Sequence, residues 1–120
     1  MEKALKATQQ NFESSSQQTP EYRRWHHLFK RQLASFLLEY GITIFKPSKP
    51  NHFDFSAFFQ TPNGQWYYVS ISDVRGFKND MLMRTADNEK DFQGGINCFV
   101  SLKSITDFRN DFESIVKLKT

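Results

Sequence analysis

The sequence predicts an α+β fold: an N-terminal helix, a central and mostly antiparallel sheet built on a three-strand meander, and a C-terminal helix packed on one face. Three observations predict this class. Two runs of β-branched and aromatic residues flank Pro62-Asn63-Gly64, and apolar residues recur at helical spacing in 20–40 and again in 104–118. Such a sheet buries one face under its helices and leaves the other to solvent or to a ligand.

The first segment, residues 1–19, is expected to be a flexible tail in front of a single α+β domain over 20–120. Residues 4–12 have the composition of a short helix, whereas 14–18 form a polar, low-complexity linker. We expect about the first dozen residues to be mobile or to dock loosely, because untethered termini usually fray.

The first predicted helix of the domain spans residues 20–40. Thr19 is a good N-cap, Pro20 suits the first helical position, and Gly41 suits the C-terminal cap. Its wide apolar face predicts burial against the sheet. That face is formed by Tyr22, Trp25, Phe29, Leu33, Phe36, Leu37 and Tyr40.

Basic side chains gather on another side of this helix. The basic strip consists of Arg23, Arg24, His27, Lys30 and Arg31. Residues 1–50 carry eight Lys/Arg against four Asp/Glu, whereas 51–120 carry eight against nine, so the positive excess lies in the first half. The strip is interpreted either as a solvated helix face or as a surface that contacts phosphates.

The central hairpin has a readable register. Pro62-Asn63-Gly64 is typical of a three-residue loop with a bulge, which places Thr61 opposite Gln65. One face then holds the apolar pairs Phe59–Tyr67, Ala57–Val69 and Phe55–Ile71. The other face holds the pairs Phe58–Tyr68, Ser56–Ser70 and Asp54–Ser72. A slip of one residue would mix the two sets, so the pattern itself supports this register.

The remaining elements are less uniform. Residues 41–45 predict a strand that ends at a rigid basic connector over 46–50, and 96–102 predict a further strand. Residues 74–95 are hard to interpret, since 80–86 fit either a short helix or a strand. The chain closes with a helix over 104–118, where Ser104 and Asp107 have capping spacing.

Composition limits the class of protein. At 120 residues and 14.2 kDa, the chain is expected to form one domain, whose 13 Phe, 4 Tyr and 2 Trp supply a large buried area. It has no apolar run long enough for a membrane helix, so no membrane partner is expected. A single cysteine excludes an internal disulfide framework and favours a reducing, cytoplasmic setting. A formal net charge of +3 does not by itself indicate nucleic acid.

The element order, with an acid on the hairpin, resembles the core of the restriction-endonuclease-like nucleases. Asp54 stands where the first metal-binding acid of that family stands. On the next strand, however, Ser70 and Ser72 stand where the family has an acid and a lysine. Serines supply neither the second carboxylate for Mg²⁺ nor the ammonium group, so the resemblance implies the fold without its catalytic centre.

Other chemistry is not indicated. Cys98 and the three histidines lack metal-ligand spacing, and no dinucleotide or phosphate-loop motif is present. We therefore expect no catalytic residue, no metal ligand and no cofactor. One carboxylate, several hydroxyls and two guanidinium groups beside aromatic rings suit a polar, nucleotide-like ligand. The candidate ligand-binding residues are Asp54, Ser56, Ser70, Ser72, Trp66, Tyr68, Arg75 and Arg84. The other interpretation is an ordinary sheet face, on which a buried Asp54 would need Arg75 or Arg84 as a partner.

Three functions remain open from the sequence. The first is a non-catalytic binding protein for nucleic acid or a nucleotide-like ligand, which would use the basic strip and the polar and aromatic hairpin face. The second is a protein-interaction module or inhibitor of a larger protein, such as an accessory protein of a mobile element. The third is a metal-dependent nuclease with an atypical centre at Asp54. The sequence indicates no oligomeric state.

Overall fold

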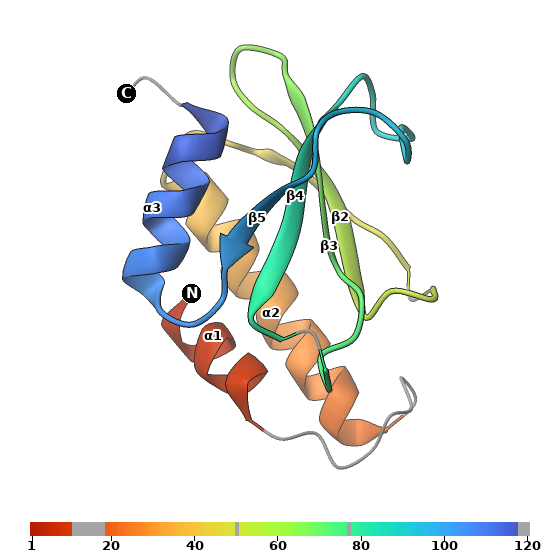
Figure 1. Ribbon diagram of the computed structural model, residues 1–120, viewed down its shortest axis with the longest axis vertical. Coiled ribbons are helices and arrows are strands. Elements are labelled where there is room, and N and C mark those ends of the chain that lie inside the picture. The colour runs from red at the N-terminus through yellow and green to blue at the C-terminus, as the bar shows by residue number, and fades with distance from the viewer. Residues whose placement is uncertain (11–18, 50, 77, 118–120) are drawn as a thin grey trace.

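The computed structural model describes residues 1–10, 19–49, 51–76 and 78–117. These residues form three helices and five strands (Figure 1). The helices are α1 (Glu2–Gln9), α2 (Pro20–Leu38) and α3 (Ile105–Val116). The strands are β1 (Ile44–Pro47), β2 (Phe55–Gln60), β3 (Trp66–Ile71), β4 (Asp80–Ala86) and β5 (Cys98–Ser101).

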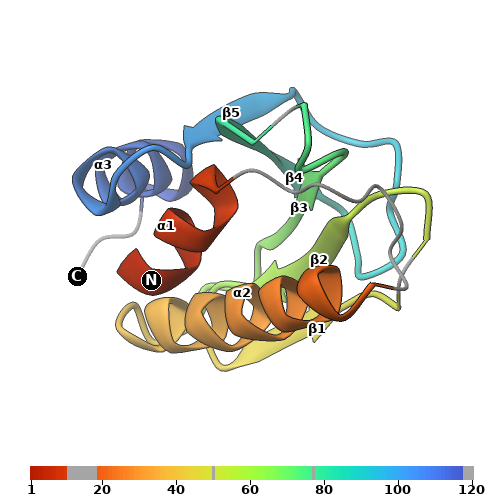
Figure 2. The same cartoon turned by 90° about the horizontal axis from the view of Figure 1, so that it is seen from below.

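The five strands form one sheet in the order β1-β2-β3-β4-β5, and every neighbouring pair is antiparallel. Side chains from all three helices share one hydrophobic cluster with the sheet, so the helices cover one face. Figure 2 shows α1 and α3 on one side of the sheet and the long loop between β4 and β5 on the other. The predicted α+β class, with its N-terminal helix, meander and C-terminal helix, is therefore confirmed.

The β2–β3 hairpin has the predicted register. Phe55 lies opposite Ile71 and Phe59 opposite Tyr67. The turn is closed by two backbone hydrogen bonds, from the amide of Thr61 to the carbonyl of Gln65 and from the amide of Gly64 to the carbonyl of Thr61, both 2.9 Å. Gly64 has a φ of +92°, the left-handed backbone that the loop requires.

The helix caps are also where the sequence predicts them. Thr19 accepts a hydrogen bond from the amide of Tyr22 at the start of α2, and Ser104 accepts one from the amide of Asp107 at the start of α3. The chain leaves α2 through Gly41, whose φ is +74°.

Aromatic rings hold the helix layer on the sheet. Phe29 of α2 packs edge-on against Phe55 of β2, with ring centroids 4.9 Å apart. About two turns further along, Phe36 meets Phe108 and Phe112 of α3 at 4.9 and 5.0 Å. The α2 helix thus joins the sheet to α3, and burial of such rings is the main favourable term in folding.

The N-terminal segment differs from its prediction as a flexible tail. Residues 2–9 form α1, whose Ala4 and Leu5 are buried in the main core. The side-chain amide of Gln9 donates to the carbonyls of Lys78 (2.8 Å) and Leu102 (3.2 Å), and the Trp25 indole donates to Thr8. These distant contacts tether the helix, so the packed unit begins before residue 20. Residues 11–18, including the predicted linker, lie outside the described residues.

Two predicted elements are also revised. The first strand is Ile44–Pro47 rather than 41–45, because Ile42 turns into the core and the strand extends into the predicted connector. Pro47 is tolerated because β1 is an edge strand. Residues 80–86 form a strand, β4, paired with both β3 and β5, so the meander continues without a crossover.

We predict that Gly64→Val lowers the free energy of unfolding by about 1 kcal/mol or more, because a β-branched residue resists positive φ. No atom lies within 4 Å of a Cβ built at Gly64, so the loss would come from the backbone alone. Gly76→Val is the matched control, since its site is equally open and its φ is not positive. Equal midpoints of thermal unfolding for the two variants would contradict the turn assignment.

Candidate ligand pocket on the open sheet face

A pocket of about 730 Å³ opens on the face of the sheet that the helices do not cover. Its floor is formed by Tyr68 and Ser70 of β3 and by Leu82 and Arg84 of β4. Tyr68 lies opposite Arg84 in the β3–β4 ladder, and Ser70 lies opposite Leu82. Strand alternation sends these side chains to one face and their neighbours, such as Met83, into the core.

Phenylalanine rings form the walls of the pocket. Phe92, in the loop between β4 and β5, and Phe99 of β5 both line it and are 60% and 58% exposed. Phe92 packs edge-on against Phe58 at 5.3 Å and against Tyr68 at 5.9 Å. Phe53, in the segment before β2, also lines the pocket. Solvent-exposed rings beside a hollow are available for contact with a ligand.

Arg84 fastens the β4–β5 loop over the sheet. The residue is only 4% exposed, and its guanidinium donates to the carbonyls of Gly94 (2.6 Å), Asp91 (2.9 Å) and Thr85 (3.3 Å). It also lies over the ring of Tyr68, 4.6 Å from the centroid. Hydrogen bonds to charged donors are stronger than those between neutral groups, so this side chain holds one wall of the pocket in place.

The loop is also organised from within. The carboxylate of Asp91 accepts hydrogen bonds from the amides of Asp87, Gln93 and Gly94. The bonds from Asp87 and Gln93 are the main reason that the pKa of Asp91 is lowered. Gly95 has a φ of +80°, and a Cβ there would lie 2.3 Å from the carbonyl oxygen of Thr85. The chain therefore passes too close to β4 for any larger residue at this position.

The predicted ligand-binding residues are brought together only in part. Tyr68, Ser70, Ser72 and Arg84 line the pocket. Ser56 is buried, and Trp66 lies near the ammonium group of Lys46, 5.9 Å from the ring centroid. Neither of these two residues lines the pocket.

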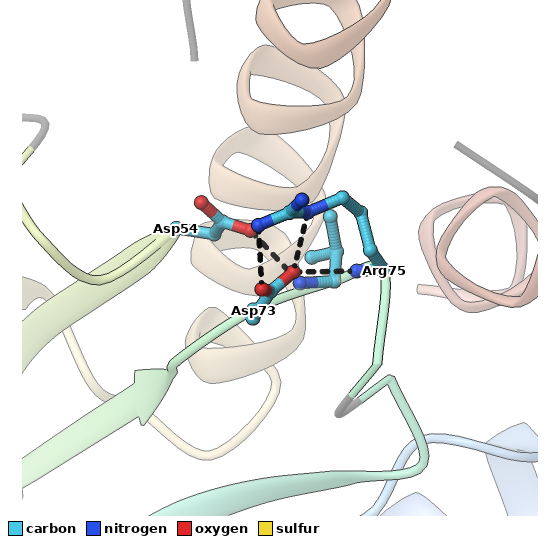
Figure 3. A network of polar contacts seen from close by, with 4 residues as sticks. Asp54, Asp73 and Arg75 are labelled. Carbon is cyan, nitrogen blue, oxygen red and sulfur yellow. Dashed lines mark hydrogen bonds and ion pairs between the residues drawn. The ribbon is translucent and has the colours of Figure 1, made fainter. Parts of the chain in front are cut away.

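Asp54 and Arg75 lie outside the pocket, beside α2 (Figure 3). The carboxylate of Asp54 accepts a hydrogen bond from the amide of Val74 (2.8 Å), while Arg75 forms an ion pair with Asp73 (2.8 Å). Asp73 follows the end of β3, where strand alternation no longer sets the direction of its side chain. The sequence offered Arg75 or Arg84 as a partner for a buried Asp54; Asp54 is only partly buried, and the hydrogen bonds of Arg84 go to the β4–β5 loop instead.

Burial and neighbouring charges shift the pKa values of Tyr22 and His26 on α2 and of Asp73 after β3. Burial, together with the nearby charge of Asp54, raises the pKa of Tyr22 to about 12, and its hydroxyl donates to the backbone carbonyl of Asp54. Burial also lowers the pKa of His26, and the charge of Lys30 adds to this effect. For Asp73, burial acts to raise the pKa, but hydrogen bonds from Arg75 outweigh it and the net shift is downward.

The basic strip on α2 does not share a surface with the pocket. Arg23, Arg24, His27 and Arg31 are exposed and Lys30 is partly exposed. None of these five forms an ion pair within the described part of the chain. Because α2 packs on the core face through Phe29, the strip and the pocket lie on opposite sides of the sheet.

No match to this chain is found among family models, curated proteins or solved structures. The resemblance to the restriction-endonuclease-like nucleases therefore stays a prediction. Among the residues that the structure describes, no three His, Cys, Asp or Glu side chains gather as a metal site. Within the same residues, no helix combines the length and apolar character that a bilayer span requires.

Apart from Arg84, sequence reasoning missed the pocket residues outside the hairpin. They include His52, Phe53, Asp80, Phe92, Asn97 and Phe99. One signal was present: Phe92 stands among polar and charged residues in a segment without periodicity, where a large ring has no regular element to bury it. These residues come together only through the fold of the β4–β5 loop, and no local sequence pattern encodes that fold.

We predict that Arg84→Met lowers the free energy of unfolding by about 2–4 kcal/mol, because it leaves three carbonyls without their charged donor. Amide hydrogen exchange should quicken at Gly94 and Asp87, whose amides bond within the loop. Arg75→Met is the control: its exposed ion pair is worth at most about 1 kcal/mol. Unchanged protection of the loop in Arg84→Met would show that this side chain does not fasten it.

Proposed function

We propose that this chain is a small non-catalytic binding protein whose pocket on the open sheet face takes a nucleotide-like ligand. The observation that supports the proposal is the convergence of three kinds of group in one pocket. These are the rings of Tyr68, Phe92 and Phe99, the hydroxyls of Ser70 and Ser72, and the buried guanidinium of Arg84.

Each kind of group suits one part of a nucleotide. Aromatic side chains stack on bases, because every base has a π-face. Hydroxyls both donate and accept, so they can satisfy the polar edge of a base or a sugar. A buried cation attracts phosphate. A pocket of about 730 Å³ falls within the size range of small-molecule sites.

A binding role is preferred to an enzymatic one on the chemistry of the lining groups. A serine nucleophile needs an adjacent base, and among the described residues no hydrogen bond joins Ser70 or Ser72 to His52. The nuclease alternative would require a second carboxylate and a lysine where these serines stand. Cleavage of DNA or RNA that depends on Mg²⁺ or Mn²⁺ and is lost in Asp54→Asn would favour that alternative instead.

The second candidate function is a protein-interaction module or inhibitor, and one observation favours it. Phe92, Phe99 and Ile96, which is 85% exposed, lie on or next to the pocket wall. Exposed apolar side chains that lie together are typical of protein-binding surfaces. A stoichiometric partner that survives high salt and is displaced by no nucleotide would support this candidate over the first.

The nucleotide in the pocket can also be part of a longer nucleic acid. The basic strip then supplies a separate surface for the phosphates of that nucleic acid. The strip lies on the other side of the sheet from the pocket, so the two surfaces act independently. Phosphate contacts confer affinity without sequence specificity and depend strongly on salt. The proposal therefore separates a base-binding pocket from a phosphate-binding helix.

We predict that the wild-type protein binds ribonucleoside monophosphates in isothermal titration calorimetry and that Phe99→Ala weakens this binding. Loss of one stacking ring should cost about 1–3 kcal/mol, or roughly 5- to 150-fold in Kd. Leu38→Ala is the matched control, since Leu38 is 59% exposed but lies on α2, away from the pocket. Equal weakening by both variants, or no nucleotide binding by the wild type, would overturn the proposed function.

For the basic strip, we predict that replacing Arg23, Lys30 and Arg31 together by Gln weakens binding to a single-stranded oligonucleotide. Each lost phosphate contact to a single strand should reduce the magnitude of the slope of log K against log salt by roughly 0.7, or about two in all. Replacing the exposed Lys3, Lys6 and Lys103 by Gln changes the net charge equally and serves as control. Identical slopes for the two triple variants would make the strip an ordinary solvated face.

A further inference from the structure

Strand β4 places two opposite charges in one pocket. Asp80, Leu82 and Arg84 alternate onto the same face of this strand, and all three line the pocket. The two charged residues are four positions apart, which corresponds to about 13 Å along an extended strand. The floor therefore has a cationic end and an anionic end, separated by an apolar side chain.

Among the described residues, the cation at the Arg84 end is hydrogen-bonded only to groups that carry no formal charge. Its three hydrogen bonds go to backbone carbonyls, and its face lies on the ring of Tyr68. The carboxylate of Asp91 interacts with the guanidinium through space, but its hydrogen bonds come from three backbone amides, so no carboxylate in the described part of the chain is hydrogen-bonded to Arg84. A buried charge beside a pocket attracts an anionic group of a ligand without direct contact.

The Asp80 end is negative and open. Asp80 is exposed, and within the described residues its carboxylate forms no ion pair and no side-chain hydrogen bond. Asn97 and Ser72 also line the pocket. An ionised carboxylate only accepts hydrogen bonds, and its two oxygens suit a pair of parallel N–H groups.

We infer that the pocket orients its ligand along β4, with the anionic group toward Arg84 and an edge that bears two N–H donors on Asp80. This inference rests on the proposed function. Among the common bases, guanine presents two adjacent donors, its ring N1–H and its exocyclic amino group, whereas adenine and cytosine place an acceptor beside their amino group. The ligand class assigned is thus a guanine nucleotide, with its base at Asp80 and its phosphate at Arg84.

Calorimetry with a set of four ligands tests this orientation on the wild-type protein. GMP should bind about 10-fold more tightly than guanosine, which lacks the phosphate, and more tightly than IMP, which lacks the exocyclic amino group. AMP should bind more weakly than GMP. The phosphate contact is tested by removing the phosphate from the ligand. Arg84 itself is not substituted, because its loss would open the β4–β5 loop. Raising the salt concentration should weaken GMP binding more than guanosine binding.

The role of Asp80 is tested with Asp80→Asn, which keeps the size and shape of the side chain and removes its charge. The variant should bind GMP about 10- to 100-fold more weakly, and it should lose the preference for GMP over IMP while it keeps the preference for GMP over guanosine. Asp107→Asn, an exposed acid on α3, should change nothing. Equal affinities for GMP, IMP and AMP, unchanged in Asp80→Asn, would overturn the orientation but leave nucleotide binding intact. An absence of binding for all four ligands would overturn the proposed function itself.

Discussion

The two faces of the sheet differ in chemistry because one turn fixes how β2 pairs with β3. With Gly64 in its left-handed conformation, Phe55 and Ile71 point toward the helices while Ser70 and Tyr68 point away. A shift of one residue would send hydroxyls into the core and phenylalanine rings to solvent. The helix layer and the pocket are therefore two results of the same pairing, and neither forms correctly without it.

The parts of the fold that could be predicted are those that local chemistry determines. Thr19 and Ser104 cap their helices with their own side chains, and Gly41 and Gly64 adopt backbone conformations that few other residues accept. The docking of α1 was missed because its contacts are distant: Gln9 bonds to Leu102 across 93 positions. β4 was ambiguous because the buried Arg84 interrupts its apolar pattern, and only the carbonyls of the folded loop make that burial favourable.

The residues of the candidate site also divide into those that local pattern predicts and those that only distant contacts bring together. Ser70, Ser72 and Tyr68 follow from strand alternation, and the structure places all three in the pocket. Asp54 does not, because it precedes β2 and its carboxylate is held by the amide of Val74. Residues from the β4–β5 loop complete the pocket through tertiary contacts, chiefly those of Arg84, and such contacts cannot be read from periodicity.

The two tryptophans of the chain lie on different sides of the sheet. Trp25 is buried beneath α1, where its indole donates to Thr8 at 2.9 Å, whereas Trp66 is partly buried on the open face near the ammonium group of Lys46. Indole emission responds to the polarity of its surroundings. The protein thus contains two built-in optical reporters: one for docking of the N-terminal helix and one for events on the open face. Replacing either tryptophan by phenylalanine would isolate the signal of the other.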